Sequence, residues 1–216
     1  MKYLATHAGY VLQLVGEHVA LAGGAIAIAA VIALPLGAFA ARRPKIGGAL
    51  LGVLGVIYTI PSLALFGLLV PLLGLGPPTA LTALVLYAQM ILVRNVVAGL
   101  RSVPPELIDA ARGLGMTAAQ TFRRIELPQA LPVIASGVRI AAVSAIAIAN
   151  LAAWIDAGGL GVLLFDGLRT DDDSKLAIGA TASALLAIGA DAALRAAEEA
   201  ARRHAGRFSA EAGAPL

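Results

Sequence analysis

Apolar residues dominate the chain in long stretches that short polar segments separate. A helix needs about 20 residues to cross the hydrocarbon core of a bilayer, which is roughly 30 Å thick. The segment from Ile46 to Val93 carries no charge, and as one helix rising about 1.5 Å per residue it would exceed twice that thickness. The pattern therefore predicts an all-α integral membrane protein with five spans, at residues 19–41, 49–73, 79–100, 130–154 and 174–194.

Prolines and glycines indicate where the second span bends and where it ends. Residues 74–78, with the sequence Gly-Leu-Gly-Pro-Pro, cannot continue a helix and predict a turn before the third span. Pro61 removes a helical hydrogen bond, and such breaks occur at membrane depth mainly where the helix faces protein or a water-filled path. Pro61 therefore marks either a translocation pathway or a structural kink that contacts no solute.

The two ends of the chain differ from the spans. In residues 1–18, apolar side chains recur at helical spacing while Gln13 and Glu17 lie off that stripe, which predicts an interfacial helix along the bilayer surface. Residues 195–216 are rich in charge and are predicted to form a cytoplasmic tail. Acids and bases four residues apart predict a solvated helix there, with the pairs Glu198–Arg202 and Glu199–Arg203.

Basic residues predict the orientation of the chain. Cytoplasmic loops of membrane proteins carry an excess of Lys and Arg. Residues 156–173, which are rich in Asp, fall on the opposite side, so we expect the N-terminus outside and the C-terminus inside. The basic residues on the predicted cytoplasmic side are Arg42, Arg43, Lys45, Arg101, Arg112, Arg123, Arg124, Arg195, Arg202, Arg203 and Arg207.

Composition excludes several classes of protein. The 216 residues are 59% hydrophobic and only 13% charged, whereas about a quarter of the residues of soluble proteins are charged. This excludes a soluble globular enzyme. A net charge of +3 is too small and too dispersed for nucleic-acid binding. The absence of cysteine excludes disulfides and thiolate metal sites.

The polar segment at residues 101–128 predicts a helix, a turn and a second helix on the cytoplasmic side. Pro104 and Pro105 can open the first helix, and Glu106 favours its positive N-terminal end. Gly115 can end this helix. Its single apolar face is predicted to contain Leu107, Ala110, Ala111 and Leu114.

The second helix of this segment begins with a capping-box sequence. Thr117 and Gln120 have the spacing at which each side chain bonds the backbone of the other residue. From there the helix is predicted to run to Leu127-Pro128. The alternative is a solvated loop that merely joins two spans, which would need neither an apolar stripe nor small residues.

The spacing of this segment resembles the EAA loop of ABC importer permeases. The pattern is carried by Asp109-Ala110-Ala111, Gly115, Ile125 and Leu127-Pro128, with Asp109 in place of the usual glutamate. The resemblance implies a coupling helix that sits in a groove on an ATP-hydrolysing subunit and passes its motion to the spans. The implied coupling residues are Glu106, Leu107, Asp109, Ala110, Ala111, Leu114, Gly115, Ile125, Leu127 and Pro128.

Two further segments resemble the osmoprotectant branch of these permeases, which transports glycine betaine, carnitine and choline. They are residues 60–64 (Ile-Pro-Ser-Leu-Ala) and 157–161 (Ala-Gly-Gly-Leu-Gly). Asp156 stands where such proteins usually have glycine. A permease for another small solute, such as methionine, is the alternative within the family, since it shares the coupling loop and a related glycine-rich segment.

The resemblance also implies partners. We expect two ATPase subunits that bind ATP and Mg, an extracytoplasmic solute-binding protein, a second permease chain that is identical or homologous, and membrane lipid. The chain itself would perform no chemistry and bind no cofactor or metal, since it has no Walker lysine motif. The multi-pass pattern places it in the inner cell membrane.

An ion-coupled secondary carrier is the rival from another class. Such carriers usually place an Asp, Glu or His at membrane depth as the coupling group. No such residue lies within the first four predicted spans, and Asp191 falls at the cytoplasmic end of the fifth. Arg139 in the fourth span is expected to snorkel toward water.

Polar and aromatic side chains within the spans are candidates for a solute pathway, although each polar group could instead bond a neighbouring helix. Four aromatic side chains could contact a quaternary ammonium through cation–π attraction, but the chain has too few aromatics for a complete cage; they are Tyr58, Tyr87, Trp154 and Phe165. An interfacial anchor is the expected role of Trp154. The pathway candidates are Tyr58, Thr59, Pro61, Ser62, Gln89 and Asn150.

Overall fold

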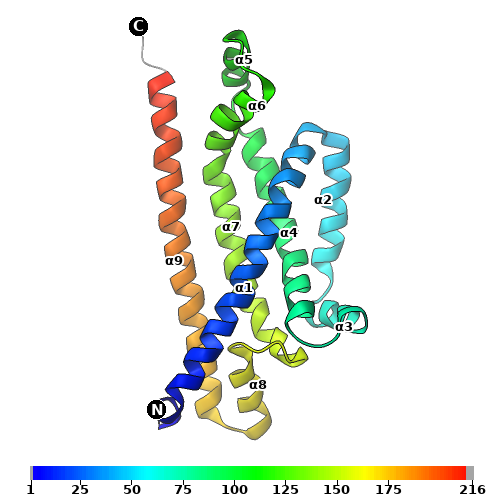
Figure 1. Cartoon of the computed structure of the whole chain (residues 1–216), viewed down its shortest axis with the longest axis vertical. Coiled ribbons are helices and arrows are strands. Elements are labelled where there is room, and N and C mark those ends of the chain that lie inside the picture. The colour runs from blue at the N-terminus through cyan, green and yellow to red at the C-terminus, as the bar shows by residue number, and fades with distance from the viewer. Residues whose placement is uncertain (1, 213–216) are drawn as a thin grey trace.

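The computed structural model describes residues 2–212, and every regular element in that part of the chain is a helix (Figure 1). This confirms the all-α prediction. The elements in chain order are α1 (Lys2–Arg42), α2 (Pro44–Thr59), α3 (Ser62–Leu73), α4 (Pro77–Arg101), α5 (Pro105–Gly113), α6 (Ala118–Thr121), the π-helix η1 (Phe122–Glu126), α7 (Leu127–Ala149), the 3-10 helix η2 (Asn150–Ile155), α8 (Gly161–Thr170) and α9 (Asp173–Ala212).

Four continuous helical segments are long and apolar enough to cross a membrane. A fifth candidate is the pair α2 and α3, which are bent by 97° at a short break. The predicted second span, residues 49–73, is therefore not one straight helix. Ile60 adopts an extended conformation with ψ 127°, as expected for a residue before proline, and Pro61 has no N–H to continue the helix. The four continuous segments are Thr6–Arg42, Pro77–Arg101, Ala118–Ile155 and Asp173–Glu199.

The helices α1, α4, α7 and α9 form the body of the molecule. α4 packs against both α1 and α7, and α7 packs against α9 (Figure 1). Small residues permit the close approach of α4 and α7. A Cβ atom added at Gly99 would lie 2.9 Å from the carbonyl oxygen of Ala130, and one added at Gly137 would overlap Asn95. This close packing is typical of helices in lipid, where contact between backbones replaces the hydrophobic drive.

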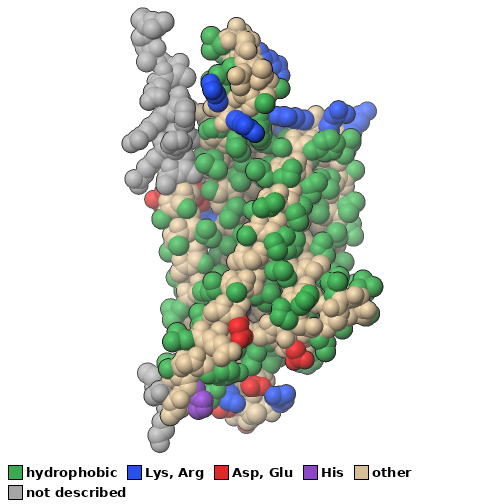
Figure 2. All heavy atoms as spheres, viewed as in Figure 1, with side chains coloured by type: hydrophobic (Ala, Val, Ile, Leu, Met, Phe, Trp, Pro, Cys, Tyr) green, Lys and Arg blue, Asp and Glu red, His purple; other side chains and the backbone are tan. Residues whose placement is uncertain are grey.

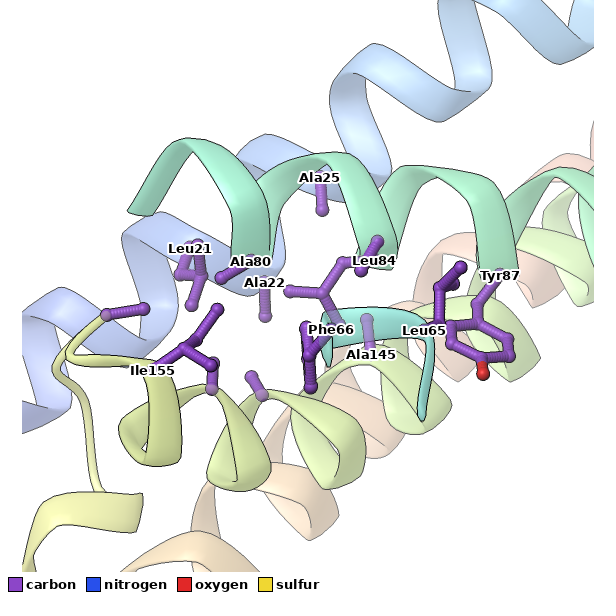
Figure 3. Packing of buried hydrophobic residues seen from close by; sticks show 14 of the residues in the cluster. Leu21, Ala22, Ala25, Leu65, Phe66, Ala80, Leu84, Tyr87, Ala145 and Ile155 are labelled. Atoms are coloured by element: carbon purple, nitrogen blue, oxygen red, sulfur yellow. The ribbon is translucent and has the colours of Figure 1, made fainter. Parts of the chain in front are cut away.

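The largest apolar cluster joins four helical segments and the short helix α3. Phe66 of α3 and Leu84 of α4 are almost completely buried there (Figure 3). Leu21 from α1, Ala145 from α7 and Ile155 from η2 complete the cluster around them. The bend at Pro61 therefore has a packing consequence, because it directs α3 into the space between α4 and η2.

Two predicted boundaries do not coincide with helix ends in the structure. Residues 1–18 are not a separate interfacial helix, because α1 continues through them to Arg42 and departs from helical geometry only at His7. The buried side chains of Val11 and Leu14 pack against Leu160 and Leu163, which explains this continuity. α9 likewise extends through the predicted tail to Ala212, and residues 213–216 lie outside the described part.

Candidate functional site

The predicted coupling loop projects beyond the ends of α1, α2 and α4 (Figure 1). Within it, α5 has Pro105 at its first position and Glu106 in its first turn, as the sequence predicts. Gly115 ends the helix in a left-handed conformation with φ 77°. Its N–H donates to the carbonyl oxygen of Arg112 at 2.9 Å. The helix end therefore depends on a backbone conformation that glycine adopts readily.

The predicted single apolar face of α5 is divided between two environments. Ala111 is buried and Leu107 is half-buried against the following turn, whereas Ala110 is exposed and 81% of Leu114 is accessible. Asp109 lies on the exposed side and pairs with Arg112 at 3.3 Å. One edge of α5 thus holds the helix on its own chain, and the other edge is open to a partner.

The second half of the loop begins with the predicted capping box. The Thr117 N–H donates to Gln120 Oε1 at 2.8 Å, and the Gln120 N–H donates to Thr117 Oγ1 at 3.3 Å. The helix predicted to run toward Leu127-Pro128 reaches these residues and continues past them, because α6, η1 and α7 follow one another without a break. The implied coupling residues Ile125, Leu127 and Pro128 are half-buried in this run.

Contacts at the base of the loop connect it to α1. The guanidinium of Arg42 lies 3.4 Å from the Glu126 carboxylate and 5.2 Å from the centre of the Phe122 ring. Arg101, at the end of α4, donates to the carbonyl oxygen of Ala40 at 3.4 Å. The base of the loop is therefore held against α1 at Arg42, and the end of α4 is held against α1 at Arg101.

Four of the six pathway candidates lie together at the break between α2 and α3. Tyr58, Thr59 and Pro61 are exposed, and Ser62 is half-buried. The Tyr87 hydroxyl donates to the carbonyl oxygen of Ile60, which the break leaves without a helical partner. The rings of Tyr58 and Tyr87 meet edge to face with their centres 5.9 Å apart. The break thus presents a polar, aromatic surface on an otherwise apolar face.

The other two candidates, Gln89 and Asn150, lie elsewhere and bond neighbouring helices. Gln89 is buried between α4 and α1, and its Nε2 donates to the carbonyl oxygen of Ala29 at 3.1 Å. Asn150 accepts a hydrogen bond from the Ser183 hydroxyl at 2.8 Å, which links η2 to α9. Both contacts fit the helix-packing role that the sequence left open as the alternative.

A polar pair on α1, which was not predicted from the sequence, holds the glycine-rich segment at residues 157–161. His18 is fully buried; its Nδ1 accepts from the Leu160 N–H at 3.2 Å, and its Nε2 lies 3.0 Å from the carbonyl oxygen of Ile146. These partners assign the proton to Nε2. The neighbouring Glu17 accepts from the Gly159 N–H at 3.0 Å. Two adjacent polar residues within an apolar helix were the available signal.

The close approach of α1 explains the glycines of that segment. A Cβ atom added at Gly158 would lie 2.6 Å from the Glu17 carboxylate, and one at Gly159 would lie 3.1 Å from His18 Nδ1. Asp156 has a left-handed backbone with φ 59°, a conformation that glycine adopts more readily than aspartate. The N–H of Gly76 donates to the carbonyl oxygen of Ile155 at 2.6 Å, so the turn before α4 also holds this segment.

Arg139 does not snorkel as predicted. It is paired with two acids of α9, at 2.8 Å from Asp191 and 3.0 Å from Glu198. Asp191 also pairs with Arg195 one helical turn further on, at 2.7 Å. The ion pairs of Arg139 therefore hold the charged end of α9 against α7.

Residues 33–203 match the family described as binding-protein-dependent transport system inner membrane component. The chain belongs to this family. It is a multi-pass permease subunit of the inner membrane, from a family that supplies the membrane component of ABC transporters and works with a separate ATPase and a substrate-binding protein.

Similar inner membrane components cover nearly the whole chain. The osmoprotectant import permease protein OsmW of Salmonella typhimurium is 42% identical over 87% of this chain and 90% of its own length. The choline transport system permease protein OpuBB of Bacillus subtilis is 36% identical over 92% of this chain and 91% of its own. The inward-facing MetNI methionine ABC transporter shares the fold, with a TM-score of 0.82 and 22% identity over 88% of this chain and 95% of that one.

Proposed function

We propose that this permease subunit imports quaternary-amine osmoprotectants such as glycine betaine, carnitine or choline, driven by ATP. The observation that carries the proposal is the similarity to an osmoprotectant permease at 42% identity over 87% of this chain. The permeases named for choline and for glycine betaine, carnitine and choline are 36% and 35% identical. Similarity at this level over 87% to 92% of the chain supports a shared class of solute.

In this proposal the exposed edge of α5 docks on the ATPase subunit. Ala110 and Leu114 are the open apolar positions of that edge, and Glu106 and Asp109 add charge beside them. ATP and Mg bind to the partner, and this chain catalyses no reaction. Closure of the ATPase would move α5, and the continuous run through η1 into α7 would carry that movement into the membrane.

The proposed topology has five crossings, with α2 and α3 together forming the second. Basic side chains gather at the end of the molecule that carries α5, and acidic side chains gather at the opposite end (Figure 2). The acidic end also carries two basic residues, Arg169 and Lys175. Arg169 is paired with Asp166 at 2.7 Å. By the bias of cytoplasmic loops toward Lys and Arg, the α5 end is cytoplasmic, the N-terminus is outside and the C-terminus inside.

A second permease chain, identical or homologous, would complete the pathway. The surface at Tyr58, Thr59 and Pro61 is exposed in the single chain, although polar and irregular backbone at membrane depth is tolerated only against protein or a water-filled cavity. A partner chain facing the break between α2 and α3 would supply that environment. An extracytoplasmic binding protein would select the solute and deliver it to this pair.

Uptake into proteoliposomes tests the proposal. The permease, its ATPase and its binding protein are reconstituted with ATP inside the vesicles on the ATPase side, and radiolabelled glycine betaine, carnitine, choline and methionine are compared. We expect uptake of at least one quaternary amine that requires both ATP and the binding protein. Uptake of methionine alone would contradict the proposed solute, and uptake driven by a proton or sodium gradient without ATP would contradict the proposed mechanism.

A further inference from the structure

An open cavity lies at the end of the molecule opposite the coupling loop, beside η2 and α8. Its volume is about 810 Å³, and Trp154, Asp156, Phe165, Asp166 and Arg169 are among its lining residues. None of these residues belongs to the coupling loop or to the break between α2 and α3. In the proposed orientation this cavity faces the side from which solute arrives.

Two aromatic rings form one wall of the cavity. The rings of Trp154 and Phe165 meet edge to face, with their centres 5.4 Å apart and their planes at 61°. Because 69% of Trp154 is accessible, the indole remains available to a ligand. Indole is the aromatic side chain that attracts a cation most strongly over its face.

Two carboxylates line the cavity, and only one of them is paired with a basic side chain. Asp166 is neutralised by Arg169 at 2.7 Å. The Asp156 side chain is exposed and has no hydrogen bond or ion pair within the part of the chain that the structure describes. The cavity therefore combines an accessible indole with one unpaired negative charge.

The backbone holds Asp156 in a fixed position. Its left-handed conformation, φ 59°, follows directly after η2, and its N–H donates to the carbonyl oxygen of Ala153 at 3.2 Å. The next N–H, of Ala157, donates to the carbonyl oxygen of Ala152 at 3.1 Å, and the Gly76 N–H holds Ile155. A carboxylate on such a restrained segment is preorganised beside Trp154.

This combination favours one class of ligand. A small, strongly hydrated metal ion needs several oxygen ligands, and only one uncompensated carboxylate is present here. A membrane-interface anchor would account for Trp154 but gives no role to the adjacent charge. A quaternary ammonium group is large and weakly hydrated, and both an aromatic face and a single carboxylate stabilise it.

We propose that Trp154, Phe165 and Asp156 form a binding site for a quaternary ammonium group at the outer end of the permease. The identification of this ligand with the transported solute rests on the proposed function. The site would hold the cationic head of a solute released by the binding protein before it enters the pathway.

The single tryptophan of the chain makes the site directly observable. The full-length permease is purified in detergent, and the emission of Trp154 is followed during titration with choline and with tetramethylammonium. The uncharged carbon isostere of choline, 3,3-dimethyl-1-butanol, and sodium chloride at equal ionic strength are the control ligands. We expect a saturable change in emission with both cations and none with either control.

Variants distinguish the contribution of the Asp156 charge to binding from that of the aromatic rings. Asp156→Asn should weaken choline binding about threefold to fivefold, as expected for the loss of an exposed charge contact. Phe165→Leu should weaken binding of both cations. The matched control is Asp171→Asn, because Asp171 is also exposed and left-handed, with φ 53°, but lies outside the cavity lining. This variant should bind as the wild type does.

Asp156→Gly is a second variant that removes the carboxylate without straining the backbone, because glycine adopts the left-handed conformation readily. It therefore distinguishes loss of the charge from misfolding. Equal responses to choline and to its neutral isostere, or unchanged binding in both Asp156 variants, would overturn the proposal, as would the absence of any saturable response. The assay needs neither ATPase nor binding protein. A saturable response in a permease that imports no quaternary amine would therefore refute the proposed function and leave the site in place.

Discussion

Gly115 and Gly158 share a positive φ, of 77° and 76°, but their surroundings differ. No atom lies within 4 Å of a Cβ added at Gly115, whereas one added at Gly158 would meet the Glu17 carboxylate. A side chain at Gly115 therefore costs backbone strain alone, and a side chain at Gly158 adds a collision with α1. The first glycine sets the geometry of the coupling loop, and the second permits contact between two helical segments.

Replacing Gly115 should disturb coupling more than assembly. A β-branched residue in the left-handed region costs about 1 to 3 kcal/mol, so Gly115→Val should tilt the end of α5. We expect unchanged membrane insertion and a severalfold fall in solute-stimulated ATP hydrolysis and uptake by the reconstituted complex. Gly113→Val is the matched control, because Gly113 is exposed and helical and has open space around it. Equal loss in both variants would contradict a special role for the backbone of Gly115.

Replacing His18 should lower stability. His18→Leu leaves the N–H of Leu160 buried without its acceptor, which costs about 1 to 3 kcal/mol. The melting temperature of the purified permease in detergent measures this loss. Glu17→Gln is the control, since its amide oxygen can still accept from Gly159, and we expect only a small change. An unchanged melting temperature for His18→Leu would show that the contact with residues 157–161 contributes little.

At the scale of elements, local sequence signals predicted the coupling loop well. α5 begins at Pro105 and ends before Gly115, and α6 begins at the Thr117 capping box. Each of these signals depends only on residues that are close together in the sequence. The bend after α2 was predicted at Pro61, but its angle was not, because Phe66 and its distant neighbours determine where α3 packs. The partners of Arg139 and His18 lie 52 or more residues away in the chain, so no local pattern indicates them.

The link between α7 and α9 should depend on Arg139. Arg139→Gln removes the α7 cation that both Asp191 and Glu198 of α9 contact, so we expect the end of α9 to separate from α7. Limited proteolysis of the purified permease should then cleave this end faster than in the wild type, with a lower melting temperature. Arg169→Gln, which breaks an exposed pair three residues apart, is the control and should have little effect. Equal proteolysis of the two variants would contradict the fastening role.

At the scale of the whole molecule, charge is divided between the two ends of the helical body (Figure 2). The chain has no cysteine, so single cysteines introduced at Arg43, Arg112 and Asp172 report accessibility without background. We expect an impermeant thiol reagent to label positions 43 and 112 only from the cytoplasmic face, and position 172 only from outside. Labelling of 112 and 172 from the same side would contradict the five-span topology.

The central proposal is that the open edge of α5 couples this permease to its ATPase. Solute-stimulated ATP hydrolysis by the reconstituted complex, measured for Leu114→Asp, tests this most directly, because a charge would enter an apolar contact without a partner. The control is Ile46→Asp, which places the same charge at another exposed apolar position near the α5 end. We predict loss of stimulation in Leu114→Asp and retention in Ile46→Asp. Normal stimulation in Leu114→Asp would show that α5 is not the coupling element.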